Sequence, residues 1–365
     1  PCLNEAESLP FCLKKVFKVL KKNKLQNVSE VIVVDNGSTD NSVQIAKKYK
    51  AKVVFSRKGY GNALRKGIEV AKGEYVAFAD ADDSYNFLEL PRFLKKADQG
   101  YDLIQGNRFQ KYGGKIHDRA MPFSHRYFGN PFLSFLVKFF FHIKFNDVFC
   151  GFRMFKKKIY LKNYYFSIGM EFAVENLIKL ARSSTKSIEI PISLHRDKRI
   201  KSASHLKTFS DGFKTLKFVA VHGIQVPSLI LSMVFLILSI QEGILNIFSA
   251  QIHESNFFYS QIFSHLCLQF IFFYFFSNLA SQKLGFEKKG VANLIYRYVS
   301  FNKSTIGFLI IFGSSSLIMI LKKFGLLQNL FNNEFLIIFI FSLSIQCFLN
   351  ILMISILEYF GDDEK

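Results

Sequence analysis

The sequence predicts an α/β domain followed by an all-helical, apolar region. Short apolar runs alternate with helical patterns along residues 1–106, as they do in open α/β sheets. The whole formal net charge of +20 lies in residues 1–225, because residues 226–365 carry eight basic and eight acidic side chains. Long apolar stretches then occupy most of residues 226–365. These three observations separate a charged half from an apolar half.

The predicted sheet is mostly parallel and Rossmann-like. Its strands are nearly continuous apolar runs, which suit a parallel sheet that helices cover on both faces. The runs lie at residues 30–35, 52–56, 74–79 and, more weakly, 102–106. The helical patterns lie at residues 5–22, 41–50, 61–72 and 87–97. Ligands of such sheets bind beyond the carboxyl ends of the strands, where Asp35 and Asp80 stand.

The rest of the charged half is less regular. Residues 127–145 are aromatic but interrupted by basic side chains, so they fit a helix lying in a membrane interface, with a buried helix as the equal alternative. Further elements are expected as a helix at 169–182, a strand at 187–194 and an amphipathic helix beside a membrane at 207–225. The predicted domains are residues 1–206, 207–225 and 226–365.

The apolar half is expected to form about four transmembrane helices. The stretches lie at residues 227–249, 260–281, 304–321 and 335–357. Each is close to the roughly 20 residues that cross a bilayer core. Five basic side chains lie between the second and third stretches, and none lies between the first and second. By the positive-inside rule, the charged half of this multi-pass membrane protein is then cytoplasmic.

The charge and the cysteines narrow the function further. A basic domain indicates an anionic partner, and nucleic acid is disfavoured because no recognition motif accompanies the charge. Lipid head groups and phosphorylated substrates remain. The five cysteines are odd in number and have no C-x-x-C spacing, so we expect neither a disulfide framework nor a zinc site. Pro1 begins a motif that ordinarily follows a strand, so a few residues are expected to precede it.

An acidic turn, Asp80-Ala81-Asp82-Asp83, directly follows the third apolar run. Two carboxylates one residue apart can hold a hard divalent cation that also grips a diphosphate. A solvated acidic turn is the alternative, because such short motifs often occur without a function. The position after a buried-type strand, with Asp35 ending a neighbouring strand, favours the metal site.

Two glycines and one glutamate are further candidates. Gly59 and Gly61 allow close backbone approach ahead of a helix N-terminus, which suits an anionic ligand. Tight packing of a helix on the sheet explains these glycines equally well. Glu171 opens a helix, where it is a catalytic residue, a positioning residue or a charge that the helix dipole favours.

Arginines form a second candidate group. Arg196 and Arg199 share a basic loop that precedes the helix expected at 207–225, and Arg108 and Arg153 each follow a glycine by two positions. A guanidinium group suits the recognition of phosphate. The alternative is a solvated face or contact with lipid head groups.

Four motifs occur in a fixed order along the charged half. They are Pro1-Cys2-Leu3-Asn4-Glu5-Ala6-Glu7, Val33-Val34-Asp35-Asn36-Gly37-Ser38-Thr39-Asp40, Gly59-Tyr60-Gly61-Asn62-Ala63 and Asp80-Ala81-Asp82-Asp83-Ser84-Tyr85. Together they resemble the motifs of family 2 glycosyltransferases, which have the GT-A fold. The resemblance covers about residues 1–215 and is greatest to the dolichyl-phosphate (polyprenyl-phosphate) mannosyl- and glucosyltransferases.

The resemblance implies roles for the motif residues. The nucleotide-binding residues would be Pro1, Leu3, Asn4, Glu5, Glu7, Asp35, Gly59 and Gly61. Asp80 and Asp82 match the Asp-x-Asp pair that holds Mg²⁺ or Mn²⁺, with Asp82 favoured as the direct ligand. Ser84 stands where the best-known members carry Gln, which leaves open whether Ser84 or Asp83 contributes to the metal site. The residues that would bind the acceptor phosphate are Arg108, Arg153, Arg196 and Arg199.

The implied function is the transfer of a monosaccharide to a lipid phosphate. The donor would be a nucleotide-diphosphate sugar of the GDP-mannose or UDP-glucose type, the acceptor polyprenyl or dolichyl phosphate, and the displacement inverting. One alternative is a processive polysaccharide synthase, which the complete lack of Trp disfavours because those enzymes carry a Gln-x-x-Arg-Trp motif. The other is a catalytically silent membrane scaffold or lipid-flipping module. The sequence does not distinguish the sugar, the base or the oligomeric state.

Overall fold

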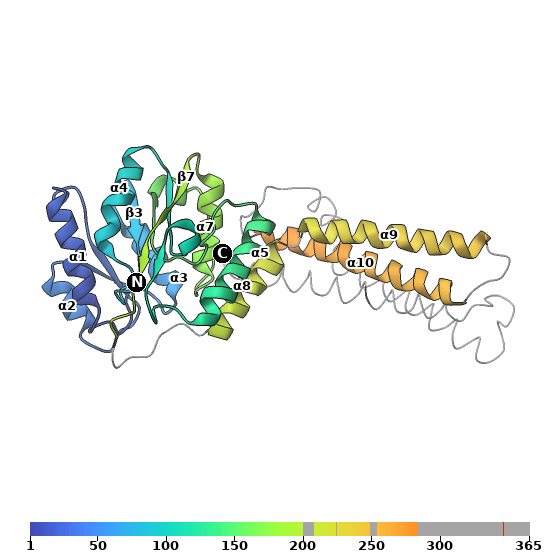
Figure 1. Ribbon diagram of the computed structural model, residues 1–365, viewed down its shortest axis with the longest axis horizontal. Coiled ribbons are helices and arrows are strands. Elements are labelled where there is room, and N and C mark those ends of the chain that lie inside the picture. Colours follow the sequence, from blue (N-terminus) through green and yellow to red (C-terminus); the bar gives the residue numbers. More distant parts are fainter. Residues whose placement is uncertain (200–207, 224, 249–253, 284–345, 347–365) are drawn as a thin grey trace. The chain divides into compact units, whose positions relative to one another are not determined.

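The computed structural model describes residues 1–199, 208–223, 225–248, 254–283 and 346 (Figure 1). The chain divides into two compact units, Pro1–Ala220 and Val221–Lys365. This boundary falls inside the helix expected at 207–225, where the structure has α8 (Thr208–Gly223). The other helices of the first unit are α1 (Leu9–Lys22), α2 (Ser42–Lys48), α3 (Tyr60–Val70), α4 (Leu90–Asp98), α5 (Asn130–Phe141), α6 (Lys157–Tyr160) and α7 (Phe172–Ser183).

The strands of the first unit form three groups. They are β1 (Ile32–Asp35), β2 (Lys52–Phe55), β3 (Tyr75–Phe78), β4 (Leu103–Asn107), β5 (Lys115–Ile116), β6 (Arg153–Lys156), β7 (Ser187–Pro191) and β8 (Ser193–Leu194). The central sheet has the order β3-β6-β4-β7, β1 pairs with β2, and β5 pairs with β8. Only β6 is antiparallel to its neighbours, β3 and β4. The α/β prediction is therefore confirmed, with one reversed strand that the sequence pattern did not predict.

The amphipathic pattern of α1 explains its position on the sheet. Leu9, Cys12 and Leu13 recur at helical spacing and are buried. Pro10 suits the first turn, where backbone amides have no partner within the helix, and Lys21 and Lys22 suit the last turn. The helix therefore turns one apolar face inward. Figure 1 shows α1 and α2 at one end of the first unit and α5 at the other.

A cluster of aromatic side chains supports the acidic turn from below. The ring of Phe152 stacks on Phe93 with centroids 4.3 Å apart, and it meets Tyr85 edge-on at 6.2 Å. Phe93 and Phe152 are among the largest fully buried side chains of the described residues. Large buried rings contribute much of the stability of a core. Tyr85, which follows the acidic turn, is thereby held in place.

Helix α5 has one buried and one exposed side. Ser134, Val137 and Phe141 are buried, and Phe141 stacks on Phe218 of α8 with centroids 6.1 Å apart. The opposite side exposes the phenyl rings of Phe132, Phe135 and Phe139, and Phe128, in the turn before the helix, is exposed as well. The helix expected within 127–145 is thus neither fully buried nor fully exposed, and its free face is aromatic.

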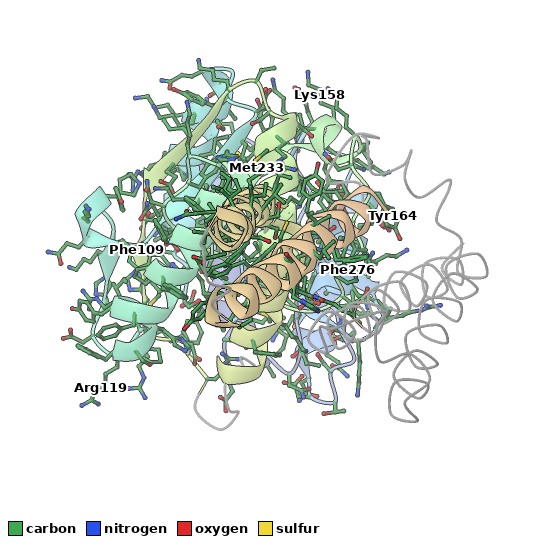
Figure 2. All side chains as sticks on the ribbon, turned by 90° about the vertical axis from the view of Figure 1, so that its right-hand side faces the viewer. Phe109, Arg119, Lys158, Tyr164, Met233 and Phe276 are labelled. Atoms are coloured by element: carbon green, nitrogen blue, oxygen red, sulfur yellow. The ribbon has the colours of Figure 1, made fainter. Side chains whose placement is uncertain are left out.

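Basic side chains point outward from the first unit. Arg119 and Lys158 are both exposed and extend from the ribbon in Figure 2. Tyr164, which is also exposed, shows the same orientation. These basic side chains are therefore available to a partner in solution or on a surface.

The second unit contains α9 (Gln225–Phe248) and α10 (Glu254–Lys283). The two helices pack through aromatic rings, as in the stacking of Phe235 on Phe270 at 5.6 Å. Within the described ranges, no helix combines the length and the apolarity that crossing a membrane requires. The spans expected at 227–249 and 260–281 are therefore not supported, and those expected at 304–321 and 335–357 lie outside the described residues, apart from residue 346.

A buried ion pair joins the end of β4 to the loop before β6. Arg108 donates from Nε to Oδ2 of Asp147 at 2.8 Å and from Nη2 to Oδ1 at 2.7 Å, and both side chains are almost fully buried. The backbone amide of Arg108 also donates to Asp147 Oδ2, at 2.9 Å. The short contacts and the additional donor offset the desolvation of two charges.

Replacing Asp147 by Asn should therefore destabilise the first unit strongly. The substitution Asp147→Asn leaves the Arg108 guanidinium buried without a counter-charge, which costs about 3–5 kcal/mol. Chemical denaturation monitored by circular dichroism measures the loss. The control is Arg92→Gln, which removes the exposed Arg92–Glu89 pair and should cost less than about 1 kcal/mol. Similar losses for the two variants would show that the buried pair is not a structural anchor.

Candidate functional site

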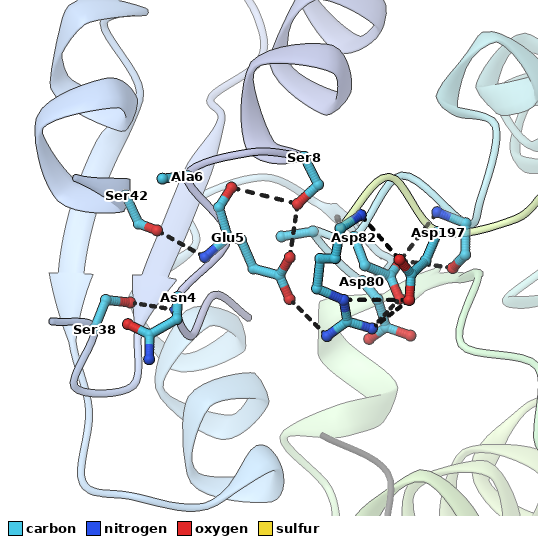
Figure 3. A network of polar contacts seen from close by, with 12 residues as sticks. Asn4, Glu5, Ala6, Ser8, Ser38, Ser42, Asp80, Asp82 and Asp197 are labelled. Atoms are coloured by element: carbon cyan, nitrogen blue, oxygen red, sulfur yellow. Dashed lines mark hydrogen bonds and ion pairs between the residues drawn. The ribbon is translucent and has the colours of Figure 1, made fainter. Parts of the chain in front are cut away.

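The loop of the first motif is fixed to the segment after β1. The amides of Asn4, Glu5 and Ala6 donate to side chains of that segment, at Ser38 Oγ (2.9 Å), Ser42 Oγ (2.8 Å) and Asp40 Oδ2 (2.9 Å) (Figure 3). In return, the amide of Thr39 donates to Asn4 Oδ1 at 2.7 Å. The first two motifs, which are about thirty residues apart in sequence, therefore form one rigid loop pair.

Asn4 and its neighbours form a partly buried loop. Asn4 has a left-handed backbone (φ +54°), a conformation that Asn tolerates better than most residues. The predicted nucleotide-binding residues Pro1, Leu3 and Glu7 are half-buried in the same loop. The structure thus brings the first-motif candidates together, as predicted, and their contact with a nucleotide stays a prediction.

Glu5 is the buried carboxylate of this loop. Ser8 donates from its hydroxyl to Glu5 Oε2 at 2.6 Å, and Arg199 donates from Nη1 to Oε1 at 3.2 Å. Burial, together with the carboxylates of Asp82 and Asp80, raises the pKa of Glu5 to about 7 against the lowering effects of the Ser8 hydrogen bond and of Arg199. Glu5 therefore lies within the electrostatic reach of the acidic turn, in the same site.

Asp35 uses its carboxylate to shape the turn after β1. Its oxygens accept the amides of Gly37 at 3.1 Å and of Ser38 at 3.2 Å. Asn36 then donates to the carbonyl of Arg57 at 2.6 Å and accepts the amide of Gly59 at 2.9 Å. Asp35 and Asn36 together position the second and third motifs through these hydrogen bonds, so both residues have a structural role. Contact of Asp35 with a base or ribose stays a prediction.

The paired carboxylates of the acidic turn face different partners. Asp80 accepts the hydroxyl of Tyr60 at 2.9 Å. Burial raises the pKa of Asp80 to about 6, with a further contribution from Asp82, while the Tyr60 hydrogen bond lowers it. Asp82 accepts the amide of Ser84 at 3.0 Å and its hydroxyl at 2.6 Å, both on Oδ1. Oδ2 of Asp82 faces Arg199 instead.

The neighbours of the pair have structural roles. Asp83 is 1% exposed and forms an ion pair with Lys15 of α1, 2.7 Å from Nζ to Oδ1. Its left-handed backbone (φ +62°) turns it away from the other two carboxylates and towards α1. Ser84 orients Asp82 through the hydrogen bonds described above. Ser84 thus positions Asp82, and Asp83 is held by Lys15.

The basic loop before residue 200 lies directly on the acidic turn. The amide of His195 donates to the carbonyl of Ser84 at 2.8 Å, and that of Lys198 donates to the carbonyl of Asp82 at 3.0 Å. Arg199 reaches Asp82 Oδ2 at 3.4 Å and Asp197 Oδ2 at 2.8 Å, in addition to Glu5. Figure 3 shows Glu5, Asp82 and Asp197 converging on this point. Arg199 therefore neutralises carboxylates of the first-motif loop and of the acidic turn in this structure.

Gly59 and Gly61 are required by packing against the segment before α7. A Cβ at Gly59 would lie 2.4 Å from the carbonyl oxygen of Ile168, and one at Gly61 would lie 2.5 Å from that of Ser167. The amide of Gly61 donates to the Ile168 carbonyl at 2.9 Å. The close packing observed at these glycines is against residues 167 and 168 before α7 and not the expected packing of a helix on the sheet, and ligand contact stays a prediction.

Glu171 lies at the start of α7 in this segment. The amide of Gly169 donates to its Oε1 at 3.0 Å, whereas Oε2 is buried without a hydrogen-bond partner among the described residues. Buried polar atoms normally have a partner, so an unpaired carboxylate oxygen is a candidate for a bound proton, water or substrate group. A role for Glu171 in the site stays a prediction.

The four candidate arginines are not brought together. Arg108 is held by Asp147, and Arg153 is fully buried, with donors to Gln105 (2.6 Å) and to Asn176 (2.6 Å). Burial lowers the pKa of Arg153 to about 10, which leaves it charged at neutral pH. Arg196 is exposed. This geometry gives Arg108 and Arg153 roles inside the fold and leaves Arg196 best placed for a phosphate in solution or on a membrane.

The acidic turn fits a divalent cation only in combination with a ligand. Within the part of the chain that the structure describes, no three His, Cys, Asp or Glu side chains cluster as a metal site. Asp80 and Asp82 supply oxygen donors of the kind that Mg²⁺ and Mn²⁺ prefer. The remaining ligands would come from a diphosphate and water. The residues present thus fit a cation that binds together with the nucleotide.

Several residues of the site were not expected from the sequence. Tyr60 donates to Asp80, Lys15 holds Asp83, and Asp197 shares Arg199 with Asp82. Tyr60 lies between the two glycines of the third motif, and this position is the signal that could have identified it. Nothing local marks Lys15, because its partner Asp83 is distant in sequence, and Asp197 is tied to the site only through the contacts of its near neighbour Arg199 with Glu5 and Asp82.

The Tyr60 hydrogen bond should set the pH range of cation binding. The ionised form of Asp80 binds the cation, so binding should weaken as the pH falls through about 6. The substitution Tyr60→Phe removes a bond that lowers the pKa, so the midpoint should move to higher pH. Calorimetric titration of Mn²⁺ in the presence of UDP or GDP between pH 5 and 8 measures it. The matched control is Tyr165→Phe, the same change at a buried hydroxyl without a hydrogen-bond partner in the described region; a shift there of equal size would contradict the assignment.

Solved structures with a related arrangement include glucosyl-3-phosphoglycerate synthase from Mycobacterium tuberculosis. The crystal structure of that enzyme with Mn²⁺, UDP and glucosyl-3-phosphoglycerate is 19% identical to this chain, with a TM-score of 0.46. The match covers 60% of this chain and 77% of the synthase.

Curated relatives are more similar in sequence. The low-salt glycan biosynthesis hexosyltransferase Agl6 of Haloferax volcanii is 32% identical over 224 residues, 61% of this chain and 52% of Agl6. The chain thus spans about half the length of that relative. The uncharacterized protein MJ0544 of Methanocaldococcus jannaschii is 31% identical over 231 residues, which cover 56% of this chain and 94% of MJ0544. Residues 1–163 match the model of glycosyl transferase family 2. The chain belongs to glycosyl transferase family 2.

Proposed function

We propose that the protein transfers a hexose from a nucleotide-diphosphate sugar to polyprenyl or dolichyl phosphate at the cytoplasmic face of a membrane. The donor is of the GDP-mannose or UDP-glucose type, and the displacement inverts the anomeric carbon. One observation carries the proposal. The loop of the first motif and the acidic turn lie against the basic loop that contains Arg196 and Arg199.

The carboxylates around the acidic turn support a nucleotide sugar as the donor. Glu5, Asp80 and Asp82 surround one point, and Arg199 contacts two of the three carboxylates there. A cation held by Asp80 and Asp82 would neutralise the charge of the departing nucleoside diphosphate. A hexose is favoured because the Haloferax relative is named a hexosyltransferase.

Because the proposed acceptor is a phosphate, the transfer does not require a catalytic base. The second pKa of a phosphate monoester is near 6, so the group is already largely an anionic nucleophile at neutral pH. The protein must then align the phosphate and neutralise its charge. Arg196, exposed in the loop that covers the acidic turn, is suited to this task. Glu171 is suited to position a substrate group through its unpaired oxygen.

A membrane location is supported by the surface of the first unit. The rings of Phe132, Phe135 and Phe139 are each more than half exposed on one side of α5, and so is Phe128 in the turn before this helix. Aromatic side chains on a helix that lies flat suit the boundary between head groups and acyl chains. Of the four apolar stretches, only those at 304–321 and 335–357, which lie outside the described residues apart from residue 346, are left to support an integral protein, and the five basic residues before them favour a cytoplasmic first unit.

A substitution at Asp82 distinguishes an enzyme from a catalytically silent scaffold. In Asp82→Asn the side chain keeps its shape and its hydrogen bond with Ser84, but it loses the negative charge. The transfer rate should fall roughly a hundredfold or more, with an unchanged circular dichroism spectrum. The assay combines membranes containing the protein, a panel of labelled nucleotide sugars, polyprenyl phosphate and Mg²⁺ or Mn²⁺, and counts chloroform-soluble label. The control is Asp98→Asn, an exposed residue at the end of α4. If no donor yields lipid-linked label, the proposal is wrong.

Arg196 should affect the acceptor more than the donor. Loss of one charge-assisted hydrogen bond in Arg196→Ala should raise the KM for polyprenyl phosphate roughly ten- to a hundredfold, with little change in the KM for the sugar donor. Steady-state kinetics with each substrate varied in turn measures both constants. Arg92→Ala, on the exposed side of α4, controls for the loss of one surface charge. Equal increases in both KM values would contradict an acceptor role.

A further inference from the structure

One basic side chain of the loop before residue 200 turns inward. The side chain of Arg199 is 6% exposed, whereas Arg196 and Lys198 of the same loop are exposed. A basic side chain is costly to bury unless acidic groups surround it. The guanidinium of Arg199 contacts three carboxylates from separate segments, those of Glu5, Asp82 and Asp197 (Figure 3). Its inward position therefore depends on the acidic groups of the candidate site.

Arg199 lies against the oxygen of Asp82 that faces away from the acidic turn. Oδ1 of Asp82 is already used within the turn, where it accepts the amide and the hydroxyl of Ser84. Oδ2 lies 3.4 Å from Nη2 of Arg199. Divalent cations bind carboxylate oxygens at about 2.0–2.6 Å, so a cation on Oδ2 would be a close neighbour of the guanidinium and repelled by it. The two therefore compete for the same oxygen.

The guanidinium is held more firmly by Asp197 than by the other two carboxylates. Its Nη2 lies 2.8 Å from Asp197 Oδ2, and the backbone amide of Arg199 donates to Asp197 Oδ1 at 2.9 Å. The contacts with Glu5 and Asp82, at 3.2 and 3.4 Å, are longer than the roughly 2.7–2.9 Å of strong charge-assisted hydrogen bonds. Arg199 can thus leave Glu5 and Asp82 while it keeps Asp197.

Lys15, the other basic group at the turn, does not compete in this way. It donates to both oxygens of Asp83, at 2.7 and 2.9 Å. Asp83 is turned towards α1 and away from Asp80 and Asp82. Among the ion pairs of the described residues, the one made by Arg199 is thus the pair that involves the Asp-x-Asp carboxylates.

We propose that Arg199 is an internal counter-ion that competes with the divalent cation for Asp82, so that the cation binds tightly only together with a nucleoside diphosphate. The proposal rests on the proposed function, because it takes Asp80 and Asp82 as the cation ligands. Since Asp197 keeps Arg199 close to the site, a cation alone must bind beside a positive charge. A diphosphate supplies the negative charge that offsets both.

The competition couples the two ligands and gives Arg199 a second partner. If the nucleotide strengthens cation binding by some factor, the cation strengthens nucleotide binding by the same factor. When Arg199 leaves Glu5 and Asp82, its Nη1 and Nη2 groups become free to donate to phosphate oxygens, which the planar guanidinium fork suits. The partner of Arg199 then changes from carboxylate to phosphate, while Asp197 keeps the side chain in place.

The test measures Mn²⁺ binding to the full chain at one fixed pH, without any sugar transfer. Arg199→Gln removes the competing charge, so the Kd for Mn²⁺ alone should fall roughly tenfold or more, and the gain from adding UDP or GDP should shrink by at least the same factor. Electron paramagnetic resonance of free Mn²⁺ measures both quantities. The matched control is Lys198→Gln, which removes one exposed positive charge from the same loop and should change the Kd less than about twofold.

A second variant keeps the test decisive if Arg199→Gln does not fold, which circular dichroism shows. Arg199→Lys retains the charge but not the fork that spans Glu5 and Asp82, so its Kd for Mn²⁺ alone should lie between those of the wild type and of Arg199→Gln. A Kd equal to that of the wild type would then overturn the inference.

The outcomes also separate this inference from the proposed function. If Arg199→Gln and Lys198→Gln change the Kd for Mn²⁺ alone equally, Arg199 does not compete with the cation, whereas nucleotide-dependent Mn²⁺ binding would still support the proposed function. If the wild type and the variants bind no Mn²⁺ even with UDP or GDP, Asp80 and Asp82 are not cation ligands, and both proposals are wrong.

Discussion

The acidic turn depends on a network of buried charges and hydroxyls beneath it. Arg108 and Asp147 form the centre of this network, and Glu189 of β7 accepts the amide of Asp147 at 2.9 Å. The Tyr85 hydroxyl accepts the amide of Gly151 at 2.7 Å and faces Arg108. Because burying charges is costly unless every group is paired, this arrangement tolerates little movement. It brings Gly151 so close to Asp80 that a side chain there would displace the carboxylate.

The carboxylates above this network are balanced by basic groups of the same chain. Lys15 holds Asp83, and Arg199 spans Glu5, Asp82 and Asp197. A cation and a diphosphate together bring little net charge, so they can replace these contacts without leaving a large charge uncompensated. The basic loop is therefore tied to the acidic turn through Arg199, while Arg196, three residues earlier, stays exposed.

The sequence predicted those parts of the fold that local patterns determine. The apolar runs predicted β1 to β4. The order of the motifs predicted that Glu5, Asp80 and Asp82 belong to one site. Strand β6 was not predicted, because Arg153 and Lys156 interrupt the apolar pattern of this short strand. Its reversed direction depends on pairing with β3 and β4, which a local pattern does not show. The buried states of Arg108 and Arg153 were not predictable either. A basic side chain becomes internal only through partners such as Asp147 and Asn176, which are more than twenty residues away.

The close contact of Gly59 and Gly61 with residues 167 and 168 has a consequence for how anions bind. The start of a helix commonly attracts phosphate because its first amides are free and its dipole is positive there. At α3, the carbonyl of Ile168 already accepts the amide of Gly61. The amide of Gly61 is thus committed to an internal contact, which leaves one fewer free amide at the start of α3. An anion held beside α3 would therefore depend more on cations and long basic side chains, and such binding weakens with rising ionic strength.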